Sequence, residues 1–401
     1  MKALFITPWY PSKYDAMSGL FVFRHAEAIV TQDIDVHVLY IVYHKDVTTP
    51  YIEHVWSEGV EQTYFYFPEK KNIFTEIKHL FRAWRYWHSH YGLPDIVHLN
   101  VLTKQILLPL YIKKKYHIPF VLTEHWSGYL PENGAFYRSK SKRFYKRAIA
   151  KASMVMPVSD LLAQAMKKAL TNNLRDITVI PNVVNDLFYS LSRNEYGKTA
   201  QQKGRDKFVF LHVSCFDNEA KNTIGIVEAA EKLLAIRDDF KVKMVGTGPD
   251  FEATKAVAEK KGLTDRGIIE FTGELLSEQV AIEMTEADAF LLFSNYETAA
   301  VVLQEATVSQ LPIISTAVGI APMILTPIIK TENNAFQISK NGIIVPKKAT
   351  DILCDAMKYM LEHRNDFDNK IKHGEEYTYK SIGEKISVIY KNILSQKNNS
   401  D

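Results

Sequence analysis

The chain of 401 residues lacks the features that mark several large protein classes. Its two cysteines, Cys215 and Cys354, are too few for a disulfide framework and are typical of a reducing compartment. No run of 18 or more apolar residues is present, which argues against a membrane-spanning helix. The first residues, MKALFITPWYP, lack the long apolar core and the cleavage site of a signal peptide. These absences predict a cytoplasmic protein.

Several motifs of catalytic and binding sites are also missing. There is no spaced His/Cys set for zinc and no G-x-S-x-G nucleophile elbow. A P-loop is absent, and no G-x-G-x-x-G follows a predicted strand. A dinucleotide-dependent oxidoreductase is therefore a weak hypothesis.

Short apolar runs alternate with longer stretches of helical pattern, and the alternation occurs twice. The runs of the first half are ALFITPW, DVHVLYIV, DIVHLN, PFVLTEH, ASMVMPVS and ITVIPNVV, and those of the second half are KFVFLHVS, KVKMVGTG, IIEFTG, AFLLFS and PIISTAV. Continuous apolar runs with helices between them are typical of parallel strands buried on both faces. The pattern predicts an α/β protein with two doubly wound Rossmann-like domains that face each other across a cleft.

Charge and polarity suggest where one domain ends along the chain and the next begins. Residues 1–190 carry a net charge of +7 and the remainder −4, so the halves are expected to meet different partners. The polar, aperiodic segment 192–206 reads as a linker. A helical stripe of apolar residues runs from Ile382 to Ile393. We predict domains over 1–188 and 189–376, with a C-terminal helix at about 377–401 that packs back on the first.

Two glutamates bracket an apolar run in the second half. Glu297 follows a predicted strand, and the run after it reads as a helix that includes Glu305. Thr298, Ala299 and Ala300 would form its first turn, where small side chains let an anionic ligand approach free backbone N–H groups. On one ideal helix the two carboxylates would project about 80° apart. The alternative interpretation is a helix cap plus one partnered glutamate.

Other polar residues follow strands of the second half. Lys221 comes after the first strand of this half and is expected to open the next helix, where it could meet a phosphate. The alternative is a solvated lysine. Gly246 and Gly248, in VGTGPD, indicate a tight turn between a strand and a helix.

The first half has its own candidates. A long loop, TPWYPSKYDAMSGLF, follows the first strand and has Gly19 near its end. His125 follows a strand and could donate or accept a proton, although a lone histidine is more often structural.

A basic stretch lies at residues 138–151. Seven basic and no acidic residues occur between Glu132 and Asp160, and Tyr137, Phe144 and Tyr145 are interleaved with them. This pattern predicts peripheral contact with anionic lipid on the inner face of a membrane, and its alternative is a solvated basic helix.

Taken in order, these motifs resemble glycosyltransferase family 4, the retaining nucleotide-sugar transferases of the GT-B fold. The resemblance rests on SGLF, PDIVHLN, TEHWSG, PVSD, VIPNVV, AKN, VGTGP and the E-x7-E pattern of Glu297 and Glu305, and it covers nearly the whole chain. It implies a hexosyltransferase that moves a sugar from UDP or GDP to a glycan or lipid-linked acceptor in cell-envelope glycan synthesis. No nucleic-acid partner is expected.

The resemblance also implies roles for individual residues. Glu297 would approach the donor sugar and Glu305 would hold the ribose hydroxyls, because carboxylates accept bonds from paired hydroxyls well. Lys221 would face the diphosphate, and His125 would lie near the donor sugar and the acceptor. Catalysis would fall to Glu297, Lys221 and His125. The donor site would be completed by a second group of residues, namely Glu305, Thr298, Ala299, Ala300, Gly19 and Gly246. The family needs no metal and no cofactor, so lysine and the helix dipole would stabilise the leaving diphosphate.

Three positions depart from the family pattern. Cys215 stands where an arginine is common, GIAPM at 319–323 replaces G-G-x-P-E, and Gln310 replaces a glycine. These changes favour an alternative function, a non-catalytic GT-B subunit that binds a partner glycosyltransferase. The glutamate pair, Lys221 and His125 argue for the enzyme.

Overall fold

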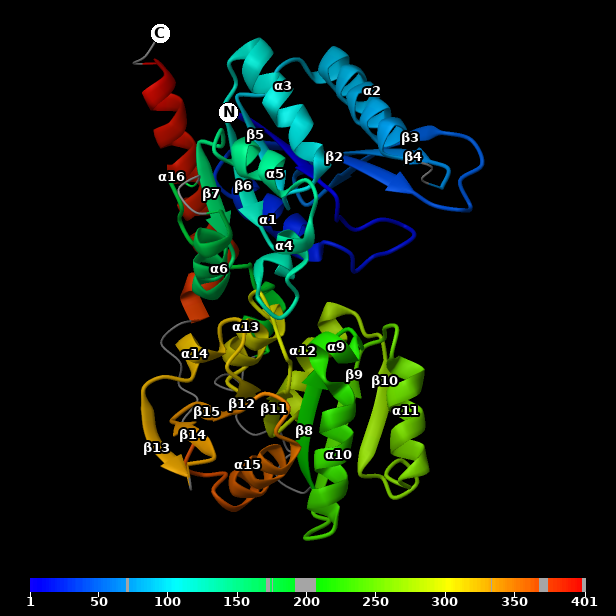
Figure 1. Cartoon of the computed structure of the whole chain (residues 1–401), viewed down its shortest axis with the longest axis vertical. Coiled ribbons are helices and arrows are strands. Elements are labelled where there is room, and N and C mark those ends of the chain that lie inside the picture. Colours follow the sequence, from blue (N-terminus) through cyan, green and yellow to red (C-terminus); the bar gives the residue numbers. More distant parts are fainter. Residues whose placement is uncertain are drawn as a thin grey trace. The chain divides into compact units, whose positions relative to one another are not determined.

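The structure, a computed structural model, describes residues 1–69, 72–170, 174, 176–191, 207–332, 334–367 and 374–398 (Figure 1). The predicted linker at 192–206 lies outside these residues. By its internal contacts the chain divides into unit 1, Met1–Val183 with Glu376–Asp401, and unit 2, Val184–Glu375. The sequence places the corresponding boundaries at 188/189 and 376/377.

Unit 1 is built on a sheet whose described strands follow the order β3-β4-β2-β1-β5-β6-β7. They are β1 (Lys2–Thr7), β2 (Asp35–Tyr43), β3 (Tyr51–Ser57), β4 (Val60–Phe67), β5 (Ile96–Asn100), β6 (Phe120–Glu124) and β7 (Met154–Pro157). All neighbours are parallel except β3 and β4, which form an antiparallel hairpin. β1, β5 and β6 are buried along nearly their whole length, as strands covered on both faces should be.

The helices of unit 1 connect these strands and cover them. They are α1 (Leu20–Val30), α2 (Ile73–Tyr91), α3 (Leu107–Tyr116), α4 (Ala135–Arg138), α5 (Lys142–Ile149), α6 (Asp160–Leu170) and α16 (Tyr379–Asn398), with 3₁₀ turns at Lys104–Ile106, Ser127–Tyr129 and Gly374–Tyr377. α16 packs against α1, and at Gly383 an added Cβ would lie 2.0 Å from the carbonyl oxygen of Ala28. The predicted stripe Ile382, Ile386, Ile389 and Tyr390 is buried in the same core as β1.

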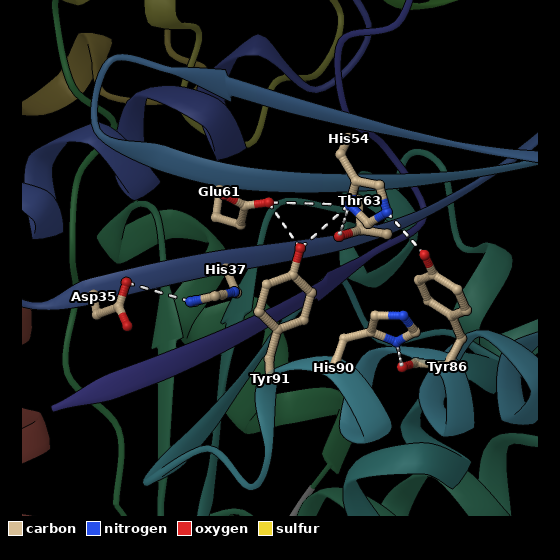
Figure 2. A network of polar contacts seen from close by, with 8 residues as sticks. All are labelled: Asp35, His37, His54, Glu61, Thr63, Tyr86, His90 and Tyr91. Atoms are coloured by element: carbon tan, nitrogen blue, oxygen red, sulfur yellow. Dashed lines mark hydrogen bonds and ion pairs between the residues drawn. The ribbon is translucent and has the colours of Figure 1, made fainter.

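Polar side chains fasten the hairpin β3–β4 to the second half of α2 (Figure 2). The Tyr91 hydroxyl donates to Glu61 Oε1 of β4 at 2.9 Å and lies 3.2 Å from Nδ1 of His54 in β3. The other ring nitrogen of His54 lies 3.0 Å from the Tyr86 hydroxyl. These bonds hold the last turns of α2 against the hairpin.

Unit 2 is built on a second sheet, whose described strands follow the order β10-β9-β8-β11-β12-β15-β14-β13. They are β8 (Phe208–Val213), β9 (Phe240–Val245), β10 (Ile269–Gly273), β11 (Ala289–Leu292), β12 (Ile313–Thr316), β13 (Ile328–Glu332), β14 (Phe336–Ser339) and β15 (Gly342–Val345). The strands from β10 to β15 are parallel, and β14 and β13 add an antiparallel edge. The helices are α7 (Asp186–Ser190), α9 (Asn218–Lys221), α10 (Thr223–Leu234), α11 (Phe251–Lys260), α12 (Ser277–Glu286), α13 (Val301–Val308), α14 (Ala321–Ile324) and α15 (Thr350–Glu362).

The prediction of two α/β domains with parallel sheets is confirmed, and one predicted strand is wrong. The segment 177–184 forms no strand; only Ile177 makes an isolated β-bridge, to Val155. Thr178 and Ile180 still donate to the carbonyls of Val155 and Pro157, but Pro157 has no N–H to return a bond, so no second bridge forms. Five strands are not anticipated, namely β3, β4, β13, β14 and β15. Within the described part of the chain, no helix is both long and apolar enough to cross a bilayer.

Candidate active site

In unit 2 the carboxyl ends of two neighbouring strands bring a lysine and a glutamate together. β8 and β11 are paired, and the segments that follow them carry Lys221 and Glu297. The ammonium Nζ of Lys221 donates to Oε1 of Glu297 at 2.6 Å, and the Ser294 hydroxyl donates to the same oxygen at 3.0 Å. The lysine and glutamate side chains are only 17% and 10% exposed. A charge-assisted pair of this kind is stronger than a neutral hydrogen bond.

Local structure fixes the position of Lys221. Asp217 caps α9 by accepting from the Ala220 N–H at 3.3 Å, and the helix ends at Lys221. Lys221 therefore closes a short helix, and it does not open the long one, because Asn222 turns left-handed with φ 50° before α10 begins. Burial works to lower the pKa of Lys221, but the Glu297 carboxylate outweighs it and the pKa lies above its usual value. The lysine is thus held as a cation.

The helix after Glu297 begins later than predicted. α13 starts at Val301, and Ala300 precedes it with φ 59°, so residues 298–300 do not form a first helical turn. The turn is held from outside: the Ile320 N–H donates to the Ala299 carbonyl at 3.1 Å. At Gly319, with φ 54°, an added Cβ would lie 2.4 Å from that same oxygen. A left-handed alanine is strained, and strain of this kind gathers at functional sites.

Glu305 lies inside α13 and is 7% exposed. Since Glu297 stands before the helix, the expected angle of about 80° between two carboxylates on one ideal helix does not apply. The structure brings Glu297 to Lys221 and places Glu305 on the following helix.

The glycines after β9 allow two loops of unit 2 to touch. Gly246 has φ 121°, and an added Cβ would lie 1.9 Å from the Ser214 carbonyl oxygen. At Gly248 an added Cβ would lie 2.6 Å from the Phe216 nitrogen. The loop that carries the exposed Cys215 therefore rests directly on the turn after β9. The predicted tight turn is present, and its glycines are required by close backbone approach.

In unit 1, His125 follows β6 and is buried. Its ring lies 4.3 Å from the ring of Phe21 and 5.7 Å from that of His25, measured between centroids. Its Nε2 has no hydrogen-bond partner among the described residues. Burial, and then the neighbouring His25 and His98, lower its pKa well below the usual value, so the ring is neutral. A buried neutral imidazole with a free nitrogen is suited to take or give one hydrogen bond from a ligand.

Glu124, which precedes His125, is a site residue that the sequence reasoning missed. It is fully buried and accepts bonds from the backbone N–H groups of Leu102, His125 and Trp126, at 2.9–3.0 Å. Burial raises its pKa to about 7 against these bonds. The carboxyl group thereby fixes the turn that presents His125. Its place in TEHW, one residue before the histidine, was the available signal.

Gly19 shapes the loop after β1. It stands at the N-terminus of α1 with φ 63°, and an added Cβ would lie 2.3 Å from the carbonyl carbon of Trp9. The loop therefore folds back onto the start of α1, which only glycine permits. Among the described residues, no group of three or more His, Cys, Asp or Glu side chains could hold a metal ion.

Comparison with known proteins identifies the family. The model "Glycosyltransferase Family 4" matches residues 19–186, and "Glycosyl transferases group 1" matches residues 197–378. A Bacillus subtilis protein named as the teichuronic acid biosynthesis glycosyltransferase TuaC is 27% identical over 56% of this chain and 54% of its own. The N-acetyl-alpha-D-glucosaminyl L-malate synthase of Bacillus anthracis is also 27% identical, over 59% of this chain and 58% of its own. The chain thus spans about half the length of the curated relatives it matches.

Solved structures agree on the fold. Sucrose-phosphate synthase from Thermosynechococcus elongatus superposes with a TM-score of 0.74 at 18% identity, over 99% of this chain and 100% of the other. At this identity the likeness shows the fold alone. With both family models and the two mainly parallel sheets in agreement, the chain belongs to glycosyltransferase family 4 and has the GT-B fold.

Proposed function

We propose that the protein transfers a hexose, with retention, from a UDP- or GDP-sugar to a lipid-linked or polysaccharide acceptor in cell-envelope glycan synthesis. The observation that carries the proposal is the Lys221–Glu297 pair at the carboxyl ends of β8 and β11. In open α/β sheets this edge is where ligands bind. The names of the two relatives support the details: one belongs to teichuronic acid biosynthesis, and the other to synthesis of an alpha-glucosaminyl product.

The proposed chemistry follows from the charges of unit 2. A nucleoside diphosphate gains negative charge as the glycosidic bond breaks, and the Lys221 ammonium is the cation placed to meet it. Its carboxylate partner, Glu297, would then accept hydrogen bonds from the sugar hydroxyls. Glu305, buried in α13, would hold the ribose, and the N-terminus of α13 would add its dipole on the phosphate side. No metal takes part in this scheme.

In unit 1 we assign His125 to the reacting sugar and the unit as a whole to the acceptor. The free Nε2 of a buried neutral ring supports this role. The basic stretch 138–151 supports peripheral contact with a membrane: Lys142, Arg143, Phe144 and Arg147 of α5 are exposed. Such contact would bring a lipid-linked acceptor to unit 1.

The alternative, a non-catalytic subunit, rests on the three departures from the family pattern. Two of these departures preserve the backbone conformation of the site. Gln310 has φ 59°, the conformation for which a glycine is preferred, and so it keeps the turn despite the substitution. Gly319 retains the glycine that the contact with Ala299 requires. Cys215 lacks the positive charge of an arginine, so Lys221 would have to balance more of the negative charge of the diphosphate.

The test uses the purified protein and a panel of UDP- and GDP-hexoses. We expect one donor to raise the melting temperature and to be hydrolysed slowly, with release of the nucleoside diphosphate, when no acceptor is present. Binding of a donor without release by any preparation, even with membrane extract as the acceptor source, would favour the non-catalytic subunit.

A further inference from the structure

The strand β3 forms one edge of the sheet of unit 1, and no described strand lies beside it on its outer side (Figure 1). Edge strands expose unpaired N–H and C=O groups that can pair with another chain, and most are protected by a proline, a lysine or a β-bulge. β3, with the sequence YIEHVWS, contains no proline or lysine, and it pairs with β4 in one uninterrupted register. This edge is therefore open to a further strand.

The three other edges of the described sheets are protected. Beside β7, backbone N–H groups of the segment 177–180 donate to carbonyls of the strand. β10 pairs with β9 through a shift of register after Phe271, and β13 pairs with β14 through a shift after Ile328. β13 also carries Lys330, whose side chain is 56% exposed. Among the described edges, β3 stands apart in lacking any of these devices.

The side chains of β3 are unusually apolar for an exposed strand. Tyr51, Ile52 and Trp56 are 37%, 38% and 66% exposed. Because side chains alternate along a strand, Ile52, His54 and Trp56 share one face. On this face the His54 ring lies against α2, with its Nε2 3.0 Å from the Tyr86 hydroxyl (Figure 2). Ile52 and Trp56 thus flank His54 at equal distance along the strand.

The backbone of these same residues faces outward. A two-residue turn at 58–59 joins β3 to β4, so Ser57 beside the turn directs its backbone groups to β4. In an antiparallel ladder alternate residues turn their N–H and C=O away from the partner strand. Counted back from Ser57, the outward residues are Ile52, His54 and Trp56. The free hydrogen-bonding groups and the exposed apolar side chains therefore belong to one set of residues.

We infer that β3 is a dimerisation edge, which pairs antiparallel with β3 of a second copy of this chain across a two-fold axis at His54. This register places Ile52 of each copy opposite Trp56 of the other, and each opposed pair would exchange both of its backbone hydrogen bonds. Pairs of an aromatic and a β-branched residue are favourable across strands. A second copy is the occupant that fits, because the strand is symmetric about His54, as an isologous two-fold contact requires.

Charge and rigidity agree with this contact. The one carboxylate of β3, Glu53, lies on the other face, where Lys13 pairs with it at 3.8 Å. In the proposed register Glu53 would lie opposite Val55 of the second copy, so no two carboxylates meet. The bonds from α2 hold the hairpin in place, so little ordering is needed on association. The inference concerns assembly, and it holds whether or not the protein turns over a donor.

The experiment is sedimentation equilibrium of the full chain at about pH 8 and at about 1–200 µM protein. We expect a dimer with a dissociation constant on the order of 10 µM, because a strand edge buries less surface than a standard interface. Trp56→Lys places a lysine on the edge and should raise this constant at least about tenfold, with the melting temperature unchanged because the side chain is exposed. Ile329→Lys on the edge strand β13, where the isoleucine is 59% exposed, is the matched control and should dimerise as wild type does.

Cysteine cross-linking tests the register, in a background where the exposed Cys215 is changed to serine. His54→Cys, on the axis, should form a disulfide-linked dimer, because opposed Cα atoms about 5.5 Å apart are within disulfide range. Ser57→Cys in the same strand should not, because Ser57 would lie opposite Tyr51 of the second copy and far from its own equivalent.

Three results would overturn the inference. The first is a chain that stays monomeric up to about 200 µM, and the second is a dimer that Trp56→Lys leaves intact. The third is cross-linking of Ser57→Cys without cross-linking of His54→Cys, which would contradict the antiparallel register. A dimer dissociated by Ile329→Lys and not by Trp56→Lys would assign the contact to β13 and reject β3.

Discussion

The carboxyl edges of the two sheets differ in whether their polar groups are charged and already paired. In unit 2 the site is charged and already satisfied, with Lys221 bonded to Glu297. In unit 1 the corresponding position is neutral and unsatisfied, with the His125 ring uncharged and its Nε2 without a partner among the described residues. Asn100, at the end of β5, is also fully buried, and both of its amide atoms lack partners in the described structure.

This difference follows from what each unit is proposed to bind. A diphosphate brings negative charge, and it must compete with Glu297 for the lysine; the carboxylate then becomes available to the sugar. A polyol acceptor brings only hydrogen bonds, so a neutral histidine and unpaired amides suffice. On the proposed function, the ion pair of unit 2 would hold the Lys221 ammonium in place until a donor binds, whereas the unpaired polar atoms of unit 1 would gain hydrogen bonds from the acceptor.

The largest expected effect comes from removing the cation of unit 2. Lys221→Ala should lower turnover by roughly 10²–10³, because Lys221 meets charge that grows in the transition state. Lys221→Arg should recover only part of the loss, since a planar guanidinium does not replace a compact ammonium. Unlike an open-cleft lysine, Lys221 is mostly buried, so the alanine variant should also lose about 1–3 kcal/mol of stability by leaving Glu297 unpaired.

The matched control is Lys243→Ala. Lys243 pairs with Glu283 at similar side-chain exposure, 15% and 18%, but on β9 and α12. This variant should lose comparable stability and keep its turnover. A folded Lys221→Ala enzyme within about threefold of wild-type turnover would mean that another group holds the diphosphate, against the loss expected for a preorganised donor.

The next largest effect is expected from acid, which should destabilise unit 1 more than unit 2. Four buried histidines of unit 1, namely His25, His37, His98 and His125, have lowered pKa values, and in unit 2 we find one such residue, His212, within the described residues. A buried histidine stays neutral while the unfolded chain binds protons below pH 6.5, so stability falls as the pH drops. His25 alone has a pKa of about 4, and it accounts for a loss of about 3 kcal/mol in the free energy of unfolding when the pH has fallen to that value.

Hydrogen exchange measured at about pH 7.5 and about pH 5 would locate this loss, and we expect the amides of unit 1 to lose protection first. Glu124 acts in the other direction: its raised pKa of about 7 adds stability as the pH falls below 7. Glu124→Gln should therefore make the acid loss of unit 1 steeper. Equal loss of protection in both units would show that the histidines are not the cause.

A smaller effect is expected at the basic helix of unit 1. Binding to anionic vesicles at low salt should fall about fivefold for each of Lys142, Arg143, Lys146 and Arg147 changed to glutamine, because each contributes about 1 kcal/mol near a charged surface. Lys167→Gln and Lys168→Gln on α6 serve as the control. Equal sedimentation of wild type with neutral and anionic vesicles would exclude lipid contact by this face.

The smallest expected effect is that of metal removal. Because Lys221 and the N-terminus of α13 are proposed to balance the diphosphate, turnover in excess EDTA should stay within about twofold of that in buffer, far from the loss for a removed donor. Loss of turnover in EDTA that Mg²⁺ or Mn²⁺ restores would place a metal in the site and weaken the role given to Lys221.

The sequence predicted the parts of the fold that short-range pattern controls. The buried strands β1 and β8 read directly from continuous apolar runs. The hairpin β3–β4 could have been found, since two runs rich in aromatic and β-branched residues flank Glu58 and Gly59, both of which have positive φ as a tight hairpin turn needs. The late start of α13 could not, because the left-handed Ala300 is imposed by a contact with Gly319, nineteen positions away.

The sequence singles out residues of the candidate site, but it does not show which of them are in contact. Lys221 and Glu297 were both singled out, but they are 76 positions apart, and only the pairing of β8 with β11 brings them into contact. Glu124 was missed because its importance lies in burial and in three backbone bonds, neither of which the chain order reveals.

The measurement that tests the central claim most directly is NMR of the purified protein turning over its nucleotide sugar with an acceptor. The account predicts release of the nucleoside diphosphate and a new glycosidic bond with the anomeric configuration of the donor, both lost in Lys221→Ala and kept in Lys243→Ala. A product of inverted configuration, or full turnover in folded Lys221→Ala, would contradict the account of unit 2 as a retaining donor site built on the Lys221–Glu297 pair.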